Sequence, residues 1–270
     1  MKFRNLAVLF AACGSLVACG GGAGSLPTGN DPGAPTTNPD GTVDLPGDAV
    51  QPGGTKTDGE NPQAEFTKLW PLTQGSTWSY RIDDPVSGVF NKTVTVLGPE
   101  TVPETQMTAI KVHSKQDRTA TTGTVYEENS WQLELTNGLV VRLREEDLTD
   151  GLRTRATTWS PAMMKSLATA PVSVPWEHQD AVRELITYDA GGTEGKDPTY
   201  VWKVLAKDVT VTTPAGTFTN AVKVQRDKLN KNGEVKEEKQ RMYWLVPGVG
   251  KVREEGERTE ELVSFDVKKP

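Results

Sequence analysis

The sequence predicts a mainly β protein: a curved antiparallel sheet or half-barrel, with a two-sheet sandwich as the alternative, and one or two short helices. Three observations lead to this prediction. Apolar and polar residues alternate along many short segments, these segments are rich in Thr and Val, and clusters of Gly, Pro, Asn and Asp separate them. Alternation with a period of two places every second side chain on the same face of a strand.

The clearest local signal is a hairpin centred on Asn137-Gly138. Apolar residues at alternate positions precede this dipeptide (Trp131, Leu133, Leu135), and others follow it (Leu139, Val141, Leu143). Asn-Gly between two alternating runs favours a tight turn, because both residues tolerate a positive φ.

Further strands are expected at residues 77–83, 89–97, 109–115, 181–189, 200–212, 218–227, 241–246 and 262–267. Turn residues separate several of them, at 84–85, 213–216, 230–233 and 247–248. One helix is expected over residues 161–168, with Ser160 as N-cap and Pro161 at the first helical position.

The N-terminus has the pattern of a secretory signal peptide. Lys2 and Arg4 precede an apolar run, which ends in Leu16-Val17-Ala18-Cys19-Gly20. This ending resembles the bacterial lipobox, and the resemblance implies cleavage before Cys19 and lipidation of its thiol. Two or three acyl chains would hold the protein on a membrane almost permanently. Gly20 stands where the inner-membrane retention signal has Asp, so the resemblance implies the outer membrane.

Residues 20–63 contain 11 Gly and 7 Pro and no Phe, Trp or Tyr. Such a segment has too little apolar surface to offset its ordering entropy, so we expect a disordered tether. The predicted organisation is therefore a signal peptide at 1–18, a lipidated Cys19 with a linker to 63, and a single β domain at 64–270.

Charge and cysteine content argue against a nucleic-acid partner and against stabilisation by disulfides. The formal charge is −6, and loss of the signal with its two cations leaves about −8, so we expect no nucleic-acid partner. Cys13 and Cys19 are the only cysteines, and neither remains available for a disulfide in the mature chain. The β domain must then depend on an ordinary hydrophobic core.

We expect no catalytic residue, no metal and no cofactor. His113 and His178 lack ligands at zinc spacing, and serine-hydrolase motifs are absent. Gly248-Val249-Gly250 is interpreted as a turn or bulge. Adjacent carboxylates at 127–128, 145–147, 254–255 and 260–261 point to opposite faces of a strand, so they do not form acid–base pairs. Cross-strand ion pairs with Arg142, Arg144, Arg253 and Arg258 on a solvated face explain them.

Four tryptophans fall inside predicted strands: Trp78, Trp131, Trp202 and Trp244. The simpler interpretation is that they pack in the core. The alternative is that they line an apolar groove for a lipid or another hydrophobic ligand.

Two segments resemble bacterial envelope lipoproteins. One is the Pro214-Ala215-Gly216-Thr217-Phe218 turn, and the other runs from Tyr243-Trp244 to Pro247-Gly248-Val249-Gly250. These proteins are distantly similar to the LolA and LolB half-barrels, in which a curved sheet shields acyl chains. The helices that close such a groove are nearly absent here, so we expect a lipid-anchored, non-enzymatic binding or structural module, with a hydrophobic ligand or an envelope protein as partner. The alternative that the resemblance implies is a carrier or acceptor of lipid or lipoprotein.

Overall fold

The computed structural model describes residues 67–269 and two short strands before them, β1 (Thr36–Thr37) and β2 (Val43–Asp44). β1 and β2 pair antiparallel within the segment expected to be a linker. The predicted signal peptide, Cys19 and the start of the domain at residue 64 lie outside the described residues, so these predictions stay open.

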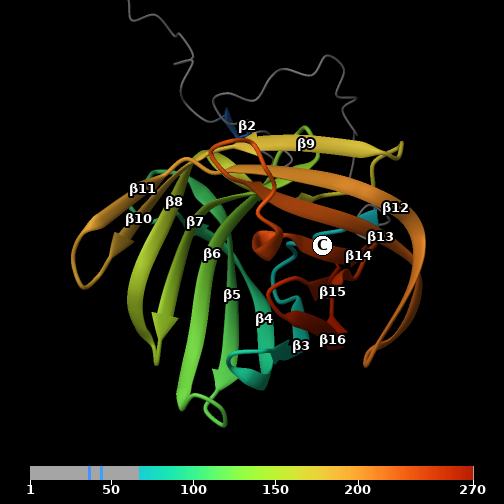
Figure 1. Cartoon of the computed structure of the whole chain (residues 1–270), viewed down its shortest axis with the longest axis horizontal. Helices are drawn as coiled ribbons and strands as arrows, with labels where there is room; N and C mark the ends of the chain where they lie inside the picture. The colour runs from blue at the N-terminus through green and yellow to red at the C-terminus, as the bar shows by residue number, and fades with distance from the viewer. Residues whose placement is uncertain (1–35, 38–42, 45–66, 270) are drawn as a thin grey trace, which may run out of the picture. The chain divides into compact units, whose positions relative to one another are not determined.

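One fourteen-stranded antiparallel sheet makes up nearly all of the described chain (Figure 1). Its order is β11-β10-β8-β7-β6-β5-β4-β3-β16-β15-β14-β13-β12-β9. The strands are β3 (Thr77–Asp84), β4 (Gly88–Thr101), β5 (Thr108–Arg118), β6 (Thr124–Glu134), β7 (Leu139–Thr149), β8 (Leu152–Leu167), β9 (Trp176–Ala181), β10 (Arg183–Tyr188), β11 (Thr193–Lys196), β12 (Thr199–Thr213), β13 (Gly216–Leu229), β14 (Arg241–Val246), β15 (Gly250–Glu255) and β16 (Thr259–Asp266). The predicted curved antiparallel sheet is confirmed.

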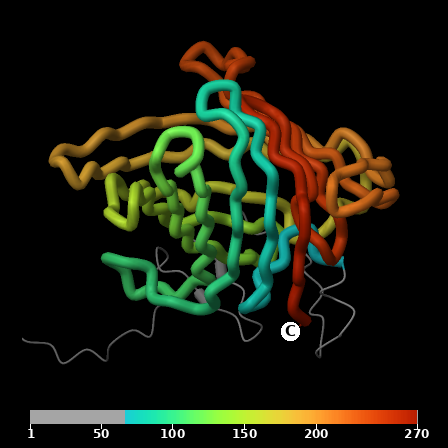
Figure 2. The backbone as a smooth tube through the Cα atoms, turned by 90° about the horizontal axis from the view of Figure 1, so that it is seen from below, coloured from blue at the N-terminus to red at the C-terminus, as the bar shows by residue number. Residues whose placement is uncertain are grey.

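β3 and β16, the first and last strands of this sheet in chain order, are neighbours within it. β3 pairs with β16 from Thr77↔Asp266 to Asp83↔Thr259, and Figure 2 shows the cyan and red segments side by side. From this central pair, the chain extends the sheet in both directions through sequential hairpins.

The strands at the two edges of the sheet belong to one long hairpin. One arm of this hairpin is β9 followed by β10, and the other arm is β11 followed by β12. β10 pairs with β8 and β11, whereas β9 pairs with β12. Between them, the Val182 amide donates to the Pro198 carbonyl (3.1 Å), which continues the ladder. The hairpin therefore connects the β8 side of the curved sheet to the β13 side.

The predicted turns are confirmed where the structure describes them. The Leu135 amide donates to the Leu139 carbonyl (2.8 Å), and Gly138 has a φ of 81°. Thr213 pairs with Gly216 at the tip of the β12–β13 hairpin. Gly248 and Gly250, with φ of 75° and 95°, form the expected turn between β14 and β15.

The predicted helix over residues 161–168 is wrong. These residues continue β8 as far as Leu167, and the described chain has no α-helix; a 3-10 turn lies at Glu237–Lys239. Pro161 lies in an irregular stretch between the Thr158↔Arg144 and Met163↔Arg142 pairs. A bulge tolerates the missing N–H, so proline does not end the strand there.

The segment before β3 ties the two sides of the sheet together. The Leu69 amide donates to the carbonyl of Ala168, just beyond β8 (2.7 Å), and the Gly248 amide donates to Lys68 (2.8 Å). Leu69 is fully buried, and Trp70 Nε1 donates to Gln132 Oε1 (2.8 Å). This segment brings Trp70 and Pro71 against the inner side of the sheet.

Candidate ligand-binding cavity

The curved sheet encloses a cavity of about 660 Å³. Every strand of the sheet except β9 contributes a side chain to its lining, and Trp70, Pro71 and Leu72 contribute from the segment before β3. This volume lies within the range typical of small-molecule sites.

The lining is predominantly charged. Twelve Lys and Arg and seven Asp and Glu line the cavity, an excess of five cations in a chain whose net charge is −6. Two of these cations, Arg155 and Lys196, pair with Asp147 and Glu194, which do not line it. The excess that remains is three, so the cavity has an electropositive interior inside an acidic protein.

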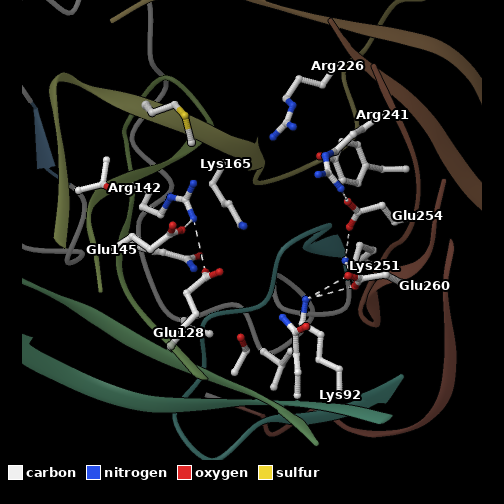
Figure 3. Close-up of a pocket in the computed structure, with 18 of the residues that line it drawn as sticks. Lys92, Glu128, Arg142, Glu145, Lys165, Arg226, Arg241, Lys251, Glu254 and Glu260 are labelled. Carbon is white, nitrogen blue, oxygen red and sulfur yellow. Dashed lines mark hydrogen bonds and ion pairs between the residues drawn. The ribbon is translucent and has the colours of Figure 1, made fainter. Parts of the chain in front are cut away.

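One ion-pair network occupies the β15–β16 side of the cavity (Figure 3). Glu260 accepts from Lys92 (3.2 Å), Lys251 (2.7 Å) and Arg258 (2.6 Å). Glu254 contacts Lys251 and accepts from Arg241 Nη1 (2.7 Å). Burial alone would raise the pKa of the Glu254 carboxyl, but Lys251 and Arg241 outweigh burial and bring it to about 2.

A second network occupies the β6–β8 side. Arg142 contacts Glu145, lies 3.4 Å from Glu128 Oε1, and stacks over Trp159 at 4.5 Å from the ring centroid. The carboxylates of Glu128, Glu145 and Asp147 lie within 4.8 Å of one another. Arg142 pairs with Glu128 and Glu145, and Arg155 pairs with Asp147, so the cluster is an ion-pair network.

Lys165 lies between the two networks and points into the space that separates them (Figure 3). It is the extra residue of a β-bulge, because Met164 pairs with Val141 and Ser166 pairs with Val140. A bulge redirects a side chain out of the regular alternation. The amine lies 5.6 Å from the Trp70 ring centroid and makes no hydrogen bond or ion pair with any described residue.

Burial, followed by Arg142, Lys251 and Lys92, lowers the pKa of the Lys165 amine to about 7, although Glu128 opposes the shift. Desolvation and neighbouring cations both disfavour the charged ammonium form.

Arg226 is the second cation of the lining that has neither a carboxylate partner nor a hydrogen bond among the described residues. Arg118 and Lys228 also lack a carboxylate partner, but they donate to Gln116 and to Tyr200. Its guanidinium lies 5.5 Å from the Tyr200 ring centroid, 5.7 Å from Trp202 and 6.0 Å from Tyr243. Its buried Nε has no hydrogen-bond partner, and no carboxylate in the described chain pairs with it. Aromatic rings hold this cation in place and leave its N–H donors free.

The structure separates the four tryptophans predicted for an apolar groove. Trp78 lines the cavity, where its Nε1 donates to the Val249 carbonyl (2.6 Å). Trp131 and Trp202 are buried in one hydrophobic cluster, and Trp244 is buried in the cluster that contains Trp78. Only one of the four lies at the cavity.

The expected solvated face is wrong for four of the nine adjacent carboxylates. Glu128, Glu145, Glu254 and Glu260 line the cavity, and Glu260 is only 1% exposed. Arg142 and Arg258 line it with them, whereas Arg144 is 2% exposed and pairs with Glu146. Cross-strand pairing holds for the outward member Glu261, which lies 3.4 Å from Arg253.

The two histidines lie apart from the cavity lining. His113 Nδ1 lies 3.0 Å from Asn129 Oδ1, and His178 stacks on Trp176 with ring centroids 6.1 Å apart.

No helix among the described residues is long and apolar enough to cross a membrane.

Sequence reasoning missed Lys165, Arg226, Lys92 and Lys251 as functional candidates. The available signal was charge at consecutive strand positions, as in Arg253-Glu254-Glu255. In such a strand both faces carry charge, so the alternation does not show which face is enclosed.

No protein-family model and no curated protein matches the chain. Among solved structures, it is similar to a "putative lipoprotein" from Parabacteroides distasonis, with 15% identity and a TM-score of 0.37. It is also similar to a "putative exported protein with YmcC-like fold" from Bacteroides fragilis, with 11% identity and a TM-score of 0.37. Both matches cover 74% of this chain and 99% of the other. Neither transfers a function.

Proposed function

We propose that the chain is an exported, lipid-anchored, non-enzymatic binding module of the outer membrane, and that its cavity binds a small hydrophilic anion. The single observation that carries the ligand class is the pair of unpartnered cations, Lys165 and Arg226, inside an electropositive cavity. The positive charge, apolar run and Cys19 at the N-terminus support export and lipid anchoring.

The chemistry of the cavity favours an anion over an acyl chain. An acyl chain in this space would strip water from charged groups without replacing their hydrogen bonds, which is costly. An anion instead supplies the acceptors that the Arg226 guanidinium and the Lys165 amine lack. Charge-assisted hydrogen bonds of this kind are among the strongest in proteins.

Isothermal titration calorimetry of the full-length protein tests the proposal. The probes are glucuronate, citrate and inorganic phosphate, with glucose as the neutral comparison. We expect at least one anion to bind and glucose not to bind. Arg226→Met should weaken binding about tenfold, which corresponds to about 1.4 kcal/mol.

Arg81→Met is the matched control, because Arg81 is exposed on the same sheet and does not line the cavity. Equal losses of anion affinity in the two variants would show that the effect comes from general surface charge, and they would contradict the proposal. Phospholipid that co-purifies with the protein, together with no anion binding, would favour the lipid carrier instead.

A further inference from the structure

We infer that Lys165 is a carbonyl-capturing amine, which forms an imine with an anionic aldehyde or ketone, such as a 2-oxo acid, bound in the cavity. The inference rests on the proposed function for the site, and it narrows the ligand to anions that carry a carbonyl group.

The bulge in β8 directs Lys165 into open space. Its neighbours Met164 and Ser166 are buried and paired with β7, whereas the Lys165 side chain reaches the cavity. A ligand of the size that fits the cavity can therefore reach the amine.

The amine also differs from the other lysines nearby. Lys92 and Lys251 each lie against the Glu260 carboxylate, which favours their ammonium forms, although burial lowers the pKa of the Lys92 amine. Lys165 has no such partner; the charged groups that act on its pKa are Arg142 on β7, Glu128 on β6, Lys251 on β15 and Lys92 on β4. Three of these four are cations. A lysine among cations in a partly desolvated site keeps a neutral, nucleophilic amine near pH 7, and burial brings its pKa to about 7.

The same cavity supplies a site for the negative charge of such a ligand. The free donors of Arg226 face the space into which Lys165 points (Figure 3). A carboxylate bound there would hold the adjacent carbonyl near the amine, which is the proximity that makes imine formation efficient.

The chemistry balances without an oxidant or a reductant. The Lys165 nitrogen adds to the carbonyl carbon, the C=O π pair moves to oxygen, and an amine proton is transferred to that oxygen. The carbinolamine then loses its hydroxyl group as water, with a proton from the nitrogen. The product is a C=N bond to Lys165 and one molecule of water.

The test traps this imine in the full-length protein. Pyruvate is added with sodium cyanoborohydride at pH 7, and the peptides are analysed by mass spectrometry. We expect a carboxyethyl group on Lys165 at more than ten times the occupancy on the exposed Lys115. Lys165→Arg keeps the positive charge and should abolish the adduct, whereas Lys115→Arg should leave it unchanged.

Lactate separates this inference from the proposed function, because it is the same anion with a hydroxyl group in place of the carbonyl. Binding of pyruvate and lactate without an adduct on Lys165 would overturn the imine and leave anion binding intact. Absence of both binding and adduct would overturn both.

A second measurement on the unmodified protein does not depend on a variant folding. Trace acetylation with acetic anhydride at increasing pH should give a Lys165 reactivity that levels off by about pH 8, since its pKa is about 7. The reactivity of an exposed lysine rises until about pH 10.4. Parallel rises for Lys165 and Lys115 would overturn the inference.

Discussion

Glu254 and Glu260 occupy directly opposed positions on β15 and β16, and both carboxylates face the cavity. Two like charges opposite each other destabilise a strand pair. Here Lys251 lies between them, in contact with Glu254 and with its Nζ 2.7 Å from Glu260 Oε2. Lys251 is therefore the cation that bridges the two opposed carboxylates, while Arg241 contacts Glu254 and Lys92 and Arg258 contact Glu260 on their other sides.

Removing that lysine should be costly. Lys251→Met leaves two buried carboxylates with fewer partners, and we expect the free energy of unfolding to fall by about 3 kcal/mol. Urea unfolding followed by circular dichroism measures the change. Lys111→Met is the control, because Lys111 pairs with the exposed Glu100 and should cost less than about 1 kcal/mol. Similar losses in both variants would show that Lys251 does not hold the strand pair.

The same network makes the stability of the protein depend on acid. The pKa of Glu254 is lowered to about 2, and that of Glu260 is also well below its usual range. Groups with a depressed folded pKa contribute stability above their unfolded pKa, near 4.3, and this contribution is lost as the pH falls towards 2. We expect a steep loss of unfolding free energy below about pH 4.5. Glu254→Gln should flatten that slope, and an unchanged slope would contradict the assignment.

Anion affinity, in contrast to stability, should change between about pH 6 and pH 9. The Lys165 amine is neutral above its pKa of about 7, and a bound anion favours its protonated form. Affinity should therefore rise as the pH falls from about 9 to 6. Calorimetry with glucuronate, whose carboxylate stays ionised throughout this range, measures the change at each pH, and Lys165→Met should make the profile flat. A profile unaffected by this substitution would place the responsible proton elsewhere.

The turn before β15 offers a backbone test. Gly250 has a φ of +95°, and an added Cβ would lie 3.3 Å from Pro71 Cδ and 3.6 Å from Trp78 Nε1. Gly233 has a φ of +81° and nothing within 4 Å. Each Ala substitution incurs about 1–2 kcal/mol of backbone strain, and Gly250→Ala should cost more because of the contact with Pro71. Equal thermal midpoints for the two variants would show that Pro71 moves aside without a measurable cost in stability.

Local turn chemistry explains why most of the sheet could be predicted. Asn137-Gly138 and Thr213-Pro214-Ala215-Gly216 specify their hairpins through backbone preferences that act within four residues. The segment around Pro161 was misjudged because its consecutive apolar residues, Ala162, Met163 and Met164, are buried together in an irregular strand. A short apolar run does not separate such a strand from a helix.

The site could not be predicted in the same way, because it depends on curvature. Lys165, Arg226 and Lys251 come from distant strands, and only the closure of the sheet brings their side chains into one cavity. Alternation correctly showed that Glu254 and Glu255 face opposite sides. It did not show that one side encloses space, since that depends on how the sheet bends over many strands.

Membrane attachment through Cys19 remains a prediction from the sequence, and a pair of cysteine variants tests it. Cys19→Ser removes the thiol that the lipobox would acylate, so the protein should move to the soluble fraction or accumulate as an uncleaved precursor. Cys13→Ser is the matched control, because Cys13 lies within the apolar run of the signal and would be removed with it. Fractionation of membranes, with metabolic labelling by a palmitate analogue, distinguishes the two variants. Palmitate label that persists at the wild-type level in a cleaved Cys19→Ser protein would contradict lipidation at Cys19, because the mature chain has no other cysteine.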